Sequence, residues 1–172
     1  MTASASFIPL SLSVLTVSDS RTADNDASGD YLCNALIDAG HRLHARAILP
    51  DDKYQLRARV SAWIADADVD GILVTGGTGF TSRDSTPEAL LPLLDKQMPG
   101  FGELFRALSF EEIGTSTMQS RAFAGLANGS FLFAMPGSTS ACRTAWEKIL
   151  RAQLDARTKP CNLVNLRPRL KA

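Results

Sequence analysis

The stretch GILVTGGTGFTSRDSTPEAL, residues 71–90, decides the fold class. It opens with an apolar run, Gly71–Thr75, which has the length and composition of a buried strand. That run passes straight into a loop with three glycines in four residues, 76–79. A strand that feeds a glycine-rich loop and then a helix is a unit from which parallel α/β sheets are built. The stretch therefore predicts an α/β domain.

The helix that follows the glycine loop is expected to begin at Ser85 or Thr86. Pro87 suits a first helical turn, where a backbone amide hydrogen has no intrahelical partner. Ser85 and Glu88 have the spacing of a capping box, in which each side chain bonds the backbone amide of the other residue. The pattern therefore predicts a helix N-terminus directly beside the glycines.

Strands and helices alternate along the rest of the chain. Strands are predicted at 11–18 and 41–49, and helices from Ser28 or Asp30 to about Ile37, over 53–67, around 101–108, and from about 139 to 157. A polar loop is expected at 111–117. Trp63 and Trp146 stand at helical apolar spacing, which favours core positions over ligand stacking.

Asn128-Gly129 separates two apolar runs near the end of the chain. This dipeptide is the strongest short signal for a tight β-hairpin, because both residues tolerate positive φ. No internal repeat interrupts the alternation. We therefore predict one domain, 1–172, built on a mostly parallel sheet with a small hairpin, and flexible ends at about 1–9 and 158–172.

Charge and composition exclude several classes of protein. The 172 residues are 45% apolar and 21% charged, with 18 basic and 18 acidic side chains and no net charge. These values are close to the averages of soluble domains. Zero net charge gives no footprint for nucleic acid, and no apolar run approaches the roughly 20 residues of a membrane span. We therefore expect neither nucleic acid nor a membrane as a partner.

The cysteines and histidines show no metal-ligand spacing. Cys33, Cys142 and Cys161 are scattered, and the chain has two histidines in all. A zinc site is therefore not expected. Odd, dispersed cysteines suit reduced thiols, and the N-terminus does not resemble a secretion signal. We expect a cytoplasmic protein.

Polar residues follow four of the predicted strands. Ser18 ends the first strand, Asp51 follows the second, the glycine loop follows the third, and 136–139 follow the last. In open parallel sheets, ligands bind beyond the carboxyl ends of the strands. If the four strands are parallel, these residues meet along one edge of the sheet.

The glycine loop suits a phosphate, although its spacing matches no common phosphate motif. Gly76, Gly77 and Gly79 let backbone amides approach an anion, and the following helix adds its positive end. No Gly-Lys-Ser/Thr follows, and the spacing differs from GxGxxG. The same glycines also suit a tight connection with positive φ. Both interpretations stay open at this point.

Asp84 strengthens the functional interpretation of the loop. It could simply cap the helix, but Ser85 and Thr86 already supply caps. A carboxylate beside a phosphate site is unfavourable unless a cation lies between them, and Mg²⁺ on a nucleotide triphosphate provides one. Asp51 is the candidate second carboxylate, or else an ordinary turn residue. Arg83 could neutralise phosphate charge or point into solvent.

The turn after the last strand is a second candidate anion site. Gly137 permits close approach of the backbone, and Ser138 or Thr139 can cap the next helix while offering a hydroxyl group. Pro136 begins this turn. Two anion sites on one edge suggest two phosphate-bearing ligands or one ligand with two phosphates. A simple turn and helix cap is the alternative.

Three segments carry a resemblance that covers roughly residues 12–154. They are GGTGFTSRDSTPEAL at 76–90, MPGSTSACRTAWEKIL at 135–150 and TVSDSRTADNDASGDYL at 16–32. They resemble the molybdenum cofactor biosynthesis proteins of the MoaB/MogA type. The resemblance implies a three-layer α/β fold of the MogA-like molybdopterin-binding kind, and a homotrimer or homohexamer.

The resemblance also implies an activity. Active members bind molybdopterin and ATP with Mg²⁺, transfer AMP to the molybdopterin phosphate and release pyrophosphate. Asp84 matches the functional aspartate of the Arg-Asp pair, and Asp51 matches the carboxylate after the second strand. Gly76, Gly77, Thr78 and Gly79 match the glycine loop, and Pro136, Gly137, Ser138 and Thr139 match the last loop. Expected partners are molybdopterin, ATP and other proteins of the molybdenum cofactor pathway.

Two alternative functions stay open from the sequence. One is a silent molybdopterin-binding paralogue, which keeps the fold and lacks turnover. The other is a nucleotide pyrophosphate hydrolase like those of the related competence-damage family. Those hydrolases typically carry two aspartates where this chain has Arg83 and Asp84, so the arginine argues against them.

Overall fold

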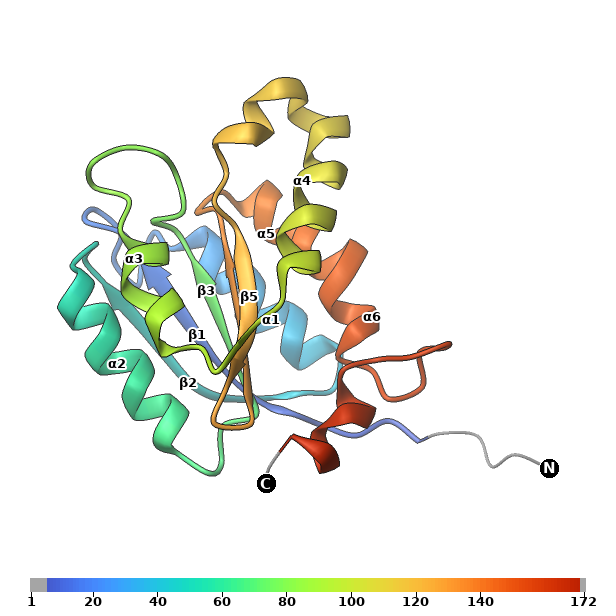
Figure 1. Ribbon diagram of the computed structural model, residues 1–172. Helices are drawn as coiled ribbons and strands as arrows, with labels where there is room; N and C mark the ends of the chain where they lie inside the picture. Colours follow the sequence, from blue (N-terminus) through green and yellow to red (C-terminus); the bar gives the residue numbers. More distant parts are fainter. Residues whose placement is uncertain (1–5, 171–172) are drawn as a thin grey trace.

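The computed structural model describes residues 6–170, and its centre is a six-stranded sheet (Figure 1). The strand order is β2-β1-β3-β6-β5-β4. The strands are β1 (Ser11–Val17), β2 (Arg42–Leu49), β3 (Gly71–Thr75), β4 (Lys96–Gln97), β5 (Phe123–Ala127) and β6 (Ser130–Met135). The pairs β2–β1, β1–β3 and β3–β6 are parallel, whereas β6–β5 and β5–β4 are antiparallel. The predicted mostly parallel sheet is confirmed.

Burial along the strands follows from their composition. Every residue of β3 and β6 is buried, as expected for continuous apolar runs covered on both faces. β2 lies at an edge of the sheet and alternates between exposed and half-buried residues along its first half. The hairpin between β5 and β6 turns at Asn128 and Gly129, whose φ angles are 48° and 80°. The predicted hairpin is therefore confirmed.

Helices cover both faces of the sheet (Figure 1). The α-helices are α1 (Ala27–Asp38), α2 (Lys53–Ala65), α3 (Thr86–Leu90), α4 (Pro99–Ile113), α5 (Thr139–Ala145) and α6 (Arg151–Gln153), and a π-helical turn, Trp146–Leu150, joins the last two. One apolar core includes Leu36 of α1, Phe105 of α4 and Trp146. The other includes Leu56 and Trp63 of α2. These two cores make the fold three-layered, and both tryptophans lie in the core as predicted.

Three helix boundaries differ from the sequence prediction. α1 is capped by Asp26, which accepts a 3.0 Å hydrogen bond from the Gly29 amide, and not by Ser28 or Asp30. α4 extends into the expected polar loop at 111–117 and ends at Ile113, because the glutamates at the start of that segment lie on the exposed side of the helix. Gly114, with a φ of 59°, caps its C-terminus. The last helix ends at Gln153 and not near 157.

The C-terminal segment packs against the domain as far as Leu170, whereas the sequence predicted a flexible end from about 158. A short 3₁₀ helix, Val164–Arg169, lies here, with Val164 3% exposed. Arg167 forms an ion pair with Asp70. At the other end, the Phe7 ring lies 5.1 Å from the His41 ring. The remaining parts of the predicted flexible ends, 1–5 and 171–172, lie outside the described residues. Within 6–170, no helix has the length and apolar character needed to cross a membrane.

Candidate active site

The four polar strand ends lie along one edge of the sheet, because β2, β1, β3 and β6 are all parallel. A cavity of about 510 Å³ opens there between the loops. We call it the glycine-loop cavity. The predicted residues that line it are Ser18, Gly76, Gly77, Thr78, Gly79, Asp84, Pro136, Gly137 and Ser138. Residues as far apart in sequence as Ser18 and Ser138 thus share one site.

A second cavity of about 520 Å³ lies beside the first. We call it the Phe80 cavity. It is lined by Asp51, Asp52, Lys53, Tyr54, Phe80, Thr81, Ser82, Asp84, Ser85, Glu88 and Arg121. Asp84 lines both cavities, so this residue lies where they meet. Arg83 and Thr139 line neither.

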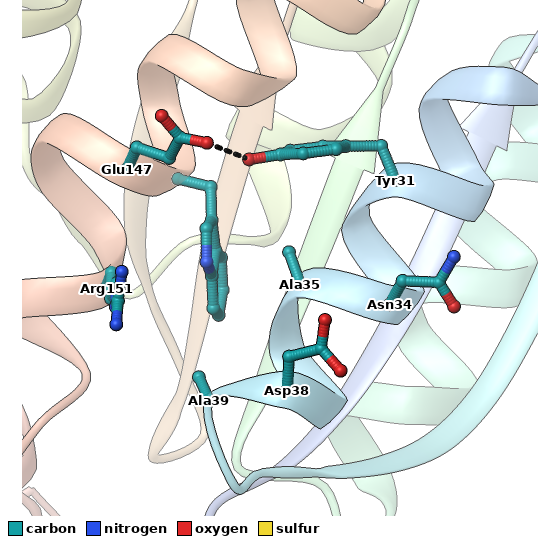
Figure 2. A pocket seen from close by; sticks show the side chains of 8 residues that line it. Tyr31, Asn34, Ala35, Asp38, Ala39, Glu147 and Arg151 are labelled. Atoms are coloured by element: carbon teal, nitrogen blue, oxygen red, sulfur yellow. Dashed lines mark hydrogen bonds between the residues drawn. The ribbon is translucent and has the colours of Figure 1, made fainter.

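A third cavity, of about 320 Å³, lies between α1 and the π-helical turn (Figure 2). Tyr31 donates a 3.1 Å hydrogen bond to Glu147 across it. Burial and the neighbouring Glu147 carboxylate raise the pKa of Tyr31 to about 12. Because none of the predicted site residues lines this cavity, it is separate from the candidate active site.

The glycine loop needs its glycines for steric reasons. Gly76 and Gly77 have φ angles of 103° and 66°. A Cβ on Gly77 would lie 2.2 Å from Thr86 Oγ1 and 2.7 Å from an oxygen of Asp51. Thr86 holds the loop by donating a 2.9 Å bond to the carbonyl of Gly76. The tight-turn interpretation is therefore confirmed, and it does not exclude a phosphate site.

The two candidate anion loops touch each other. A Cβ on Gly137 would lie 3.3 Å from the Cα of Gly76. Ser138, and not Thr139, caps α5 by accepting a 3.2 Å bond from the Ala141 amide. Ser18 accepts bonds of 3.2 Å from the amides of Ser20 and Arg21, which orders the turn after β1. The three turns form one continuous rim around the glycine-loop cavity.

Asp84 does not cap α3, and its carboxylate belongs to the loop. It accepts bonds from the Thr81 amide at 2.8 Å and from the Thr81 hydroxyl at 2.6 Å. A Cβ on Gly79 would lie 2.8 Å from the same carboxylate, so Gly79 makes room for it. Burial raises the pKa of Asp84, but hydrogen bonds from Thr81 and Gly79 and the charge of Arg121 outweigh it and lower the pKa. Asp84 is therefore ionised at neutral pH.

Asp51 accepts hydrogen bonds from Ser85, the residue whose side chain the capping box required at the start of α3. The amide of Ser85 donates to Asp51 Oδ1 at 3.0 Å, and the Ser85 hydroxyl bonds the same oxygen. Ser85 makes no side-chain cap, and Glu88 pairs with Arg121, so the predicted capping box is wrong. Burial raises the pKa of Asp51, and the nearby charges of Asp84 and Asp19 raise it further, against the hydrogen bonds from Ser85.

Arg83 lines neither cavity and pairs with Asp19. Its side chain is 68% exposed and donates to Asp19 Oδ2 at 2.6 Å and 3.1 Å. The other oxygen of Asp19 accepts a 3.0 Å bond from the Asp51 amide. Arg83 thus connects the loop after β3 to the turns after β1 and β2. The hydrogen bond from Arg83 lowers the pKa of Asp19.

Sequence reasoning missed Arg121. This residue donates to the carbonyls of Gly79 and Asp84, both at 2.7 Å, and forms an ion pair with Glu88. Its own amide bonds the carbonyl of Thr78 at 2.8 Å. The hydrogen bond from Arg121 lowers the pKa of Glu88. Nothing near Arg121 in the sequence marks this role, because all of its partners lie more than 30 residues away.

Two further side chains of the glycine-loop cavity can contact an anion: Arg21, which was not predicted from the sequence, and Thr78, which belongs to the predicted glycine loop. Arg21 donates a 3.3 Å bond to the carbonyl of Gly137, which brings one guanidinium to the rim. The hydroxyl of Thr78 is buried and has no hydrogen-bond partner among the described residues. A cation, a polar group that lacks a partner and the Gly77 and Thr78 amides all suit an anionic ligand.

This fold and site are typical of α/β proteins that bind phosphate-bearing ligands at the carboxyl edge of the sheet. The model of one protein family, described as a probable molybdopterin binding domain, matches residues 13–156. The chain therefore belongs to this molybdopterin-binding family, as the sequence resemblance predicted.

Individual relatives agree with the family match. Molybdenum cofactor biosynthesis protein B of Escherichia coli strain K12 is 59% identical over 159 residues, covering 92% of this chain and 94% of that protein. A crystal structure of a molybdenum cofactor biosynthesis protein B has a TM-score of 0.85 at 40% identity, covering 95% of this chain and 96% of the other. The tungsten cofactor synthesizing protein MoaB of Pyrococcus furiosus has a TM-score of 0.75 at 36% identity, with coverages of 83% and 91%. The expected fold is confirmed.

Proposed function

We propose that this protein acts in molybdenum cofactor biosynthesis by transferring AMP from ATP to the phosphate of molybdopterin. The observation that carries the proposal is the position of Asp84, which lines two cavities of similar size. A transfer between two phosphate-bearing substrates needs two adjoining sites that meet at the reacting phosphorus. An ionised carboxylate at that junction suits such a reaction.

The reaction needs no side-chain nucleophile. An oxygen of the molybdopterin phosphate attacks the α-phosphorus of ATP and forms a new P–O bond. The bond from the α-phosphorus to the oxygen shared with the β-phosphate breaks, and pyrophosphate leaves with that oxygen. Catalysis then depends on positioning and on neutralising charge. The Gly77 and Thr78 amides and Arg21 supply positive partners for phosphate oxygens, whereas the Gly76 amide bonds the carbonyl of Met135 and the Gly79 amide bonds Asp84.

The carboxylates fit a magnesium ion that arrives with the nucleotide. Among residues 6–170, no group of three or more His, Cys, Asp and Glu side chains forms a ready metal cage. Mg²⁺ is commonly held by one or two carboxylates together with substrate phosphates, and Asp84 and Asp51 are the residues that would hold it. When bound, the ion neutralises phosphate charge. Such a cation also relieves the repulsion between the two carboxylates, which helps to raise the pKa of Asp51.

We further propose that the protein is a cytoplasmic homotrimer or homohexamer that works with other proteins of the same pathway. The protruding end of α4 and the turn after it support self-association, because Phe110, Ile113 and Met118 are 56%, 55% and 79% exposed. Light scattering on the purified protein tests this part. A monomer at micromolar concentration would exclude it.

The test of the activity incubates the protein with molybdopterin, ATP and Mg²⁺ and measures adenylylated molybdopterin and pyrophosphate. Formation of both products supports the proposal. Molybdopterin binding without product would instead identify a silent paralogue. Cleavage of a nucleotide pyrophosphate bond without a pterin acceptor would identify a hydrolase.

A further inference from the structure

His41 is a buried titratable side chain that the proposed reaction does not use. It is 5% exposed and directly precedes β2, so it lies at the amino end of a strand whose carboxyl end forms part of the candidate active site. Its Nδ1 accepts a 3.1 Å hydrogen bond from the Leu10 amide. A ring nitrogen that accepts a hydrogen bond carries no proton, so His41 is neutral here, with its proton on Nε2.

Residues 6–10, which we call the N-terminal strap, also contact His41 through an aromatic ring. The Phe7 ring lies 5.1 Å from the His41 ring, and the guanidinium carbon of Arg157 lies 5.1 Å from the centre of the Phe7 ring. A Cβ on Gly40 would lie 2.9 Å from the Phe7 ring, so Phe7 fits into a space that the glycine leaves open. The strap therefore rests on His41 at two points, the Leu10 amide and the Phe7 ring.

The surroundings of His41 disfavour its charged form. The edge of the Trp146 ring faces it, with 6.2 Å between the ring centres. Asp155 is the nearby carboxylate that favours the cation, but it is already paired with Arg157. Burial lowers the pKa of His41, and this effect outweighs that of Asp155. The charged residues beside Trp146 and at the end of α1 line the third cavity instead, and they are Asp38, Glu147 and Arg151.

We propose that His41 is a pH-sensitive latch, whose protonation at Nδ1 breaks the bond to the Leu10 amide and releases the N-terminal strap from the domain. A proton on Nδ1 would point at the Leu10 amide hydrogen and leave two buried donors without an acceptor. The buried cation would also lie against Phe7, close to the positive charge of Arg157. The Leu10 carbonyl keeps its 2.8 Å bond from the Arg42 amide, so the opening ends at Leu10 and the sheet stays intact.

The direction of the pH effect follows from the two states of the strap. In the open state His41 is exposed and has its ordinary pKa of 6.5, whereas burial lowers the pKa in the closed state. Above pH 6.5 both states are neutral and the strap is fully held. As pH falls below 6.5, opening becomes up to about tenfold more favourable per pH unit, until the lower pKa of the closed state is reached. The latch does not depend on the proposed function.

The experiment measures hydrogen exchange of the Leu10 amide at pH 7.5 and pH 5.0, corrected for intrinsic exchange rates. The protection of this amide in the wild type should fall by about tenfold or more at pH 5.0, while that of Arg42 is retained. His41→Asn places an amide oxygen near the position of Nδ1 and cannot titrate, so its protection should be the same at both pH values. His44→Asn is the matched control, because it removes the second of the two histidines, which pairs with Asp66, and it should behave like the wild type.

Several outcomes would overturn the latch. They are equal protection of Leu10 at both pH values in the wild type, a loss at pH 5.0 that persists in His41→Asn, and a loss that disappears in His44→Asn. An equal loss of protection at Arg42 would show general unfolding and reject release of the strap alone. NMR titration of the His41 ring in the wild type gives a test that needs no variant: the protection of Leu10 must fall over the pH range that begins at 6.5 and ends at the measured pKa of His41.

Discussion

Arg121 donates a 2.7 Å hydrogen bond to the backbone oxygen of Asp84, although 37 residues separate the two in the chain. The same guanidinium donates to the carbonyl of Gly79 at 2.7 Å. One rigid planar group therefore holds both ends of the loop segment that carries the Asp84 carboxylate. The position of Asp84 between the two cavities depends on this contact.

We expect Arg121→Gln to lower both stability and AMP transfer. Losing the charged donor should cost roughly 2 kcal/mol, which corresponds to about 4–8 °C in Tm for a chain of this size. Misplacing Asp84 should reduce kcat by about 100-fold. Arg121→Lys keeps the charge but not the planar fork, so it should recover little of the rate. Thermal unfolding and product formation measure the two effects.

Arg106 provides a matched control for Arg121. It also donates from its guanidinium to backbone oxygens, at 3.0 Å to Ala122 and 3.4 Å to Ser120, but it does not line either cavity. Arg106→Gln should therefore lower Tm without changing kcat of the folded enzyme. Equal losses of kcat in both variants would show that Arg121 acts only through stability.

Asp84→Asn tests the carboxylate at the junction of the cavities. The amide keeps the size of the side chain and removes its charge, so transfer should fall by at least about 100-fold while the fold is retained. Circular dichroism and light scattering check the fold and the assembly. Asp38→Asn, an exposed position on α1, should retain full activity. A fully active Asp84→Asn variant would reject the assigned role.

The sequence predicts those parts of the site that depend on neighbouring residues. The apolar run before Gly76 and the spacing of the glycines define the third strand and its loop, and parallel topology then brings the other strand ends to the same edge. Contacts between side chains that are distant in the sequence cannot be predicted in this way. Ser85 could form a capping box by spacing alone, but the Asp51 carboxylate from another loop competes for its hydroxyl. The role of Arg121 could not be predicted for the same reason, because its contacts with Gly79, Asp84 and Glu88 form only in the folded chain.

Asp51→Asn should change the pH dependence of stability. The pKa of Asp51 is raised mainly by burial, so the folded protein holds this proton more tightly than the unfolded chain does. Below the ordinary value of 3.8 both states are protonated and Asp51 has little effect. As pH rises through the raised folded pKa, the ionised Asp51 lowers the stability of the wild type. Relative to the wild type, Asp51→Asn should thus become more stable between acidic and neutral pH.

Chemical denaturation at pH 4 and pH 7 measures this difference without ligand. Adding Mg²⁺ and ATP should then stabilise the wild type more than Asp51→Asn, because the variant lacks a proposed carboxylate ligand. A difference between the two proteins that does not vary with pH would mean that Asp51 has the same pKa in the folded and unfolded states.

Gly77→Ala should strongly destabilise the protein. Its φ of 66° disfavours any side chain, and the added Cβ would lie 2.2 Å from Thr86 Oγ1, the hydroxyl that bonds the carbonyl of Gly76. Strain and overlap together should cost roughly 2–4 kcal/mol. Gly100→Ala is the matched control, because a Cβ there meets nothing within 4 Å, and it should be neutral or stabilising by up to about 1 kcal/mol. If denaturation shows similar stabilities for the two variants, the loop must have room that this geometry does not provide.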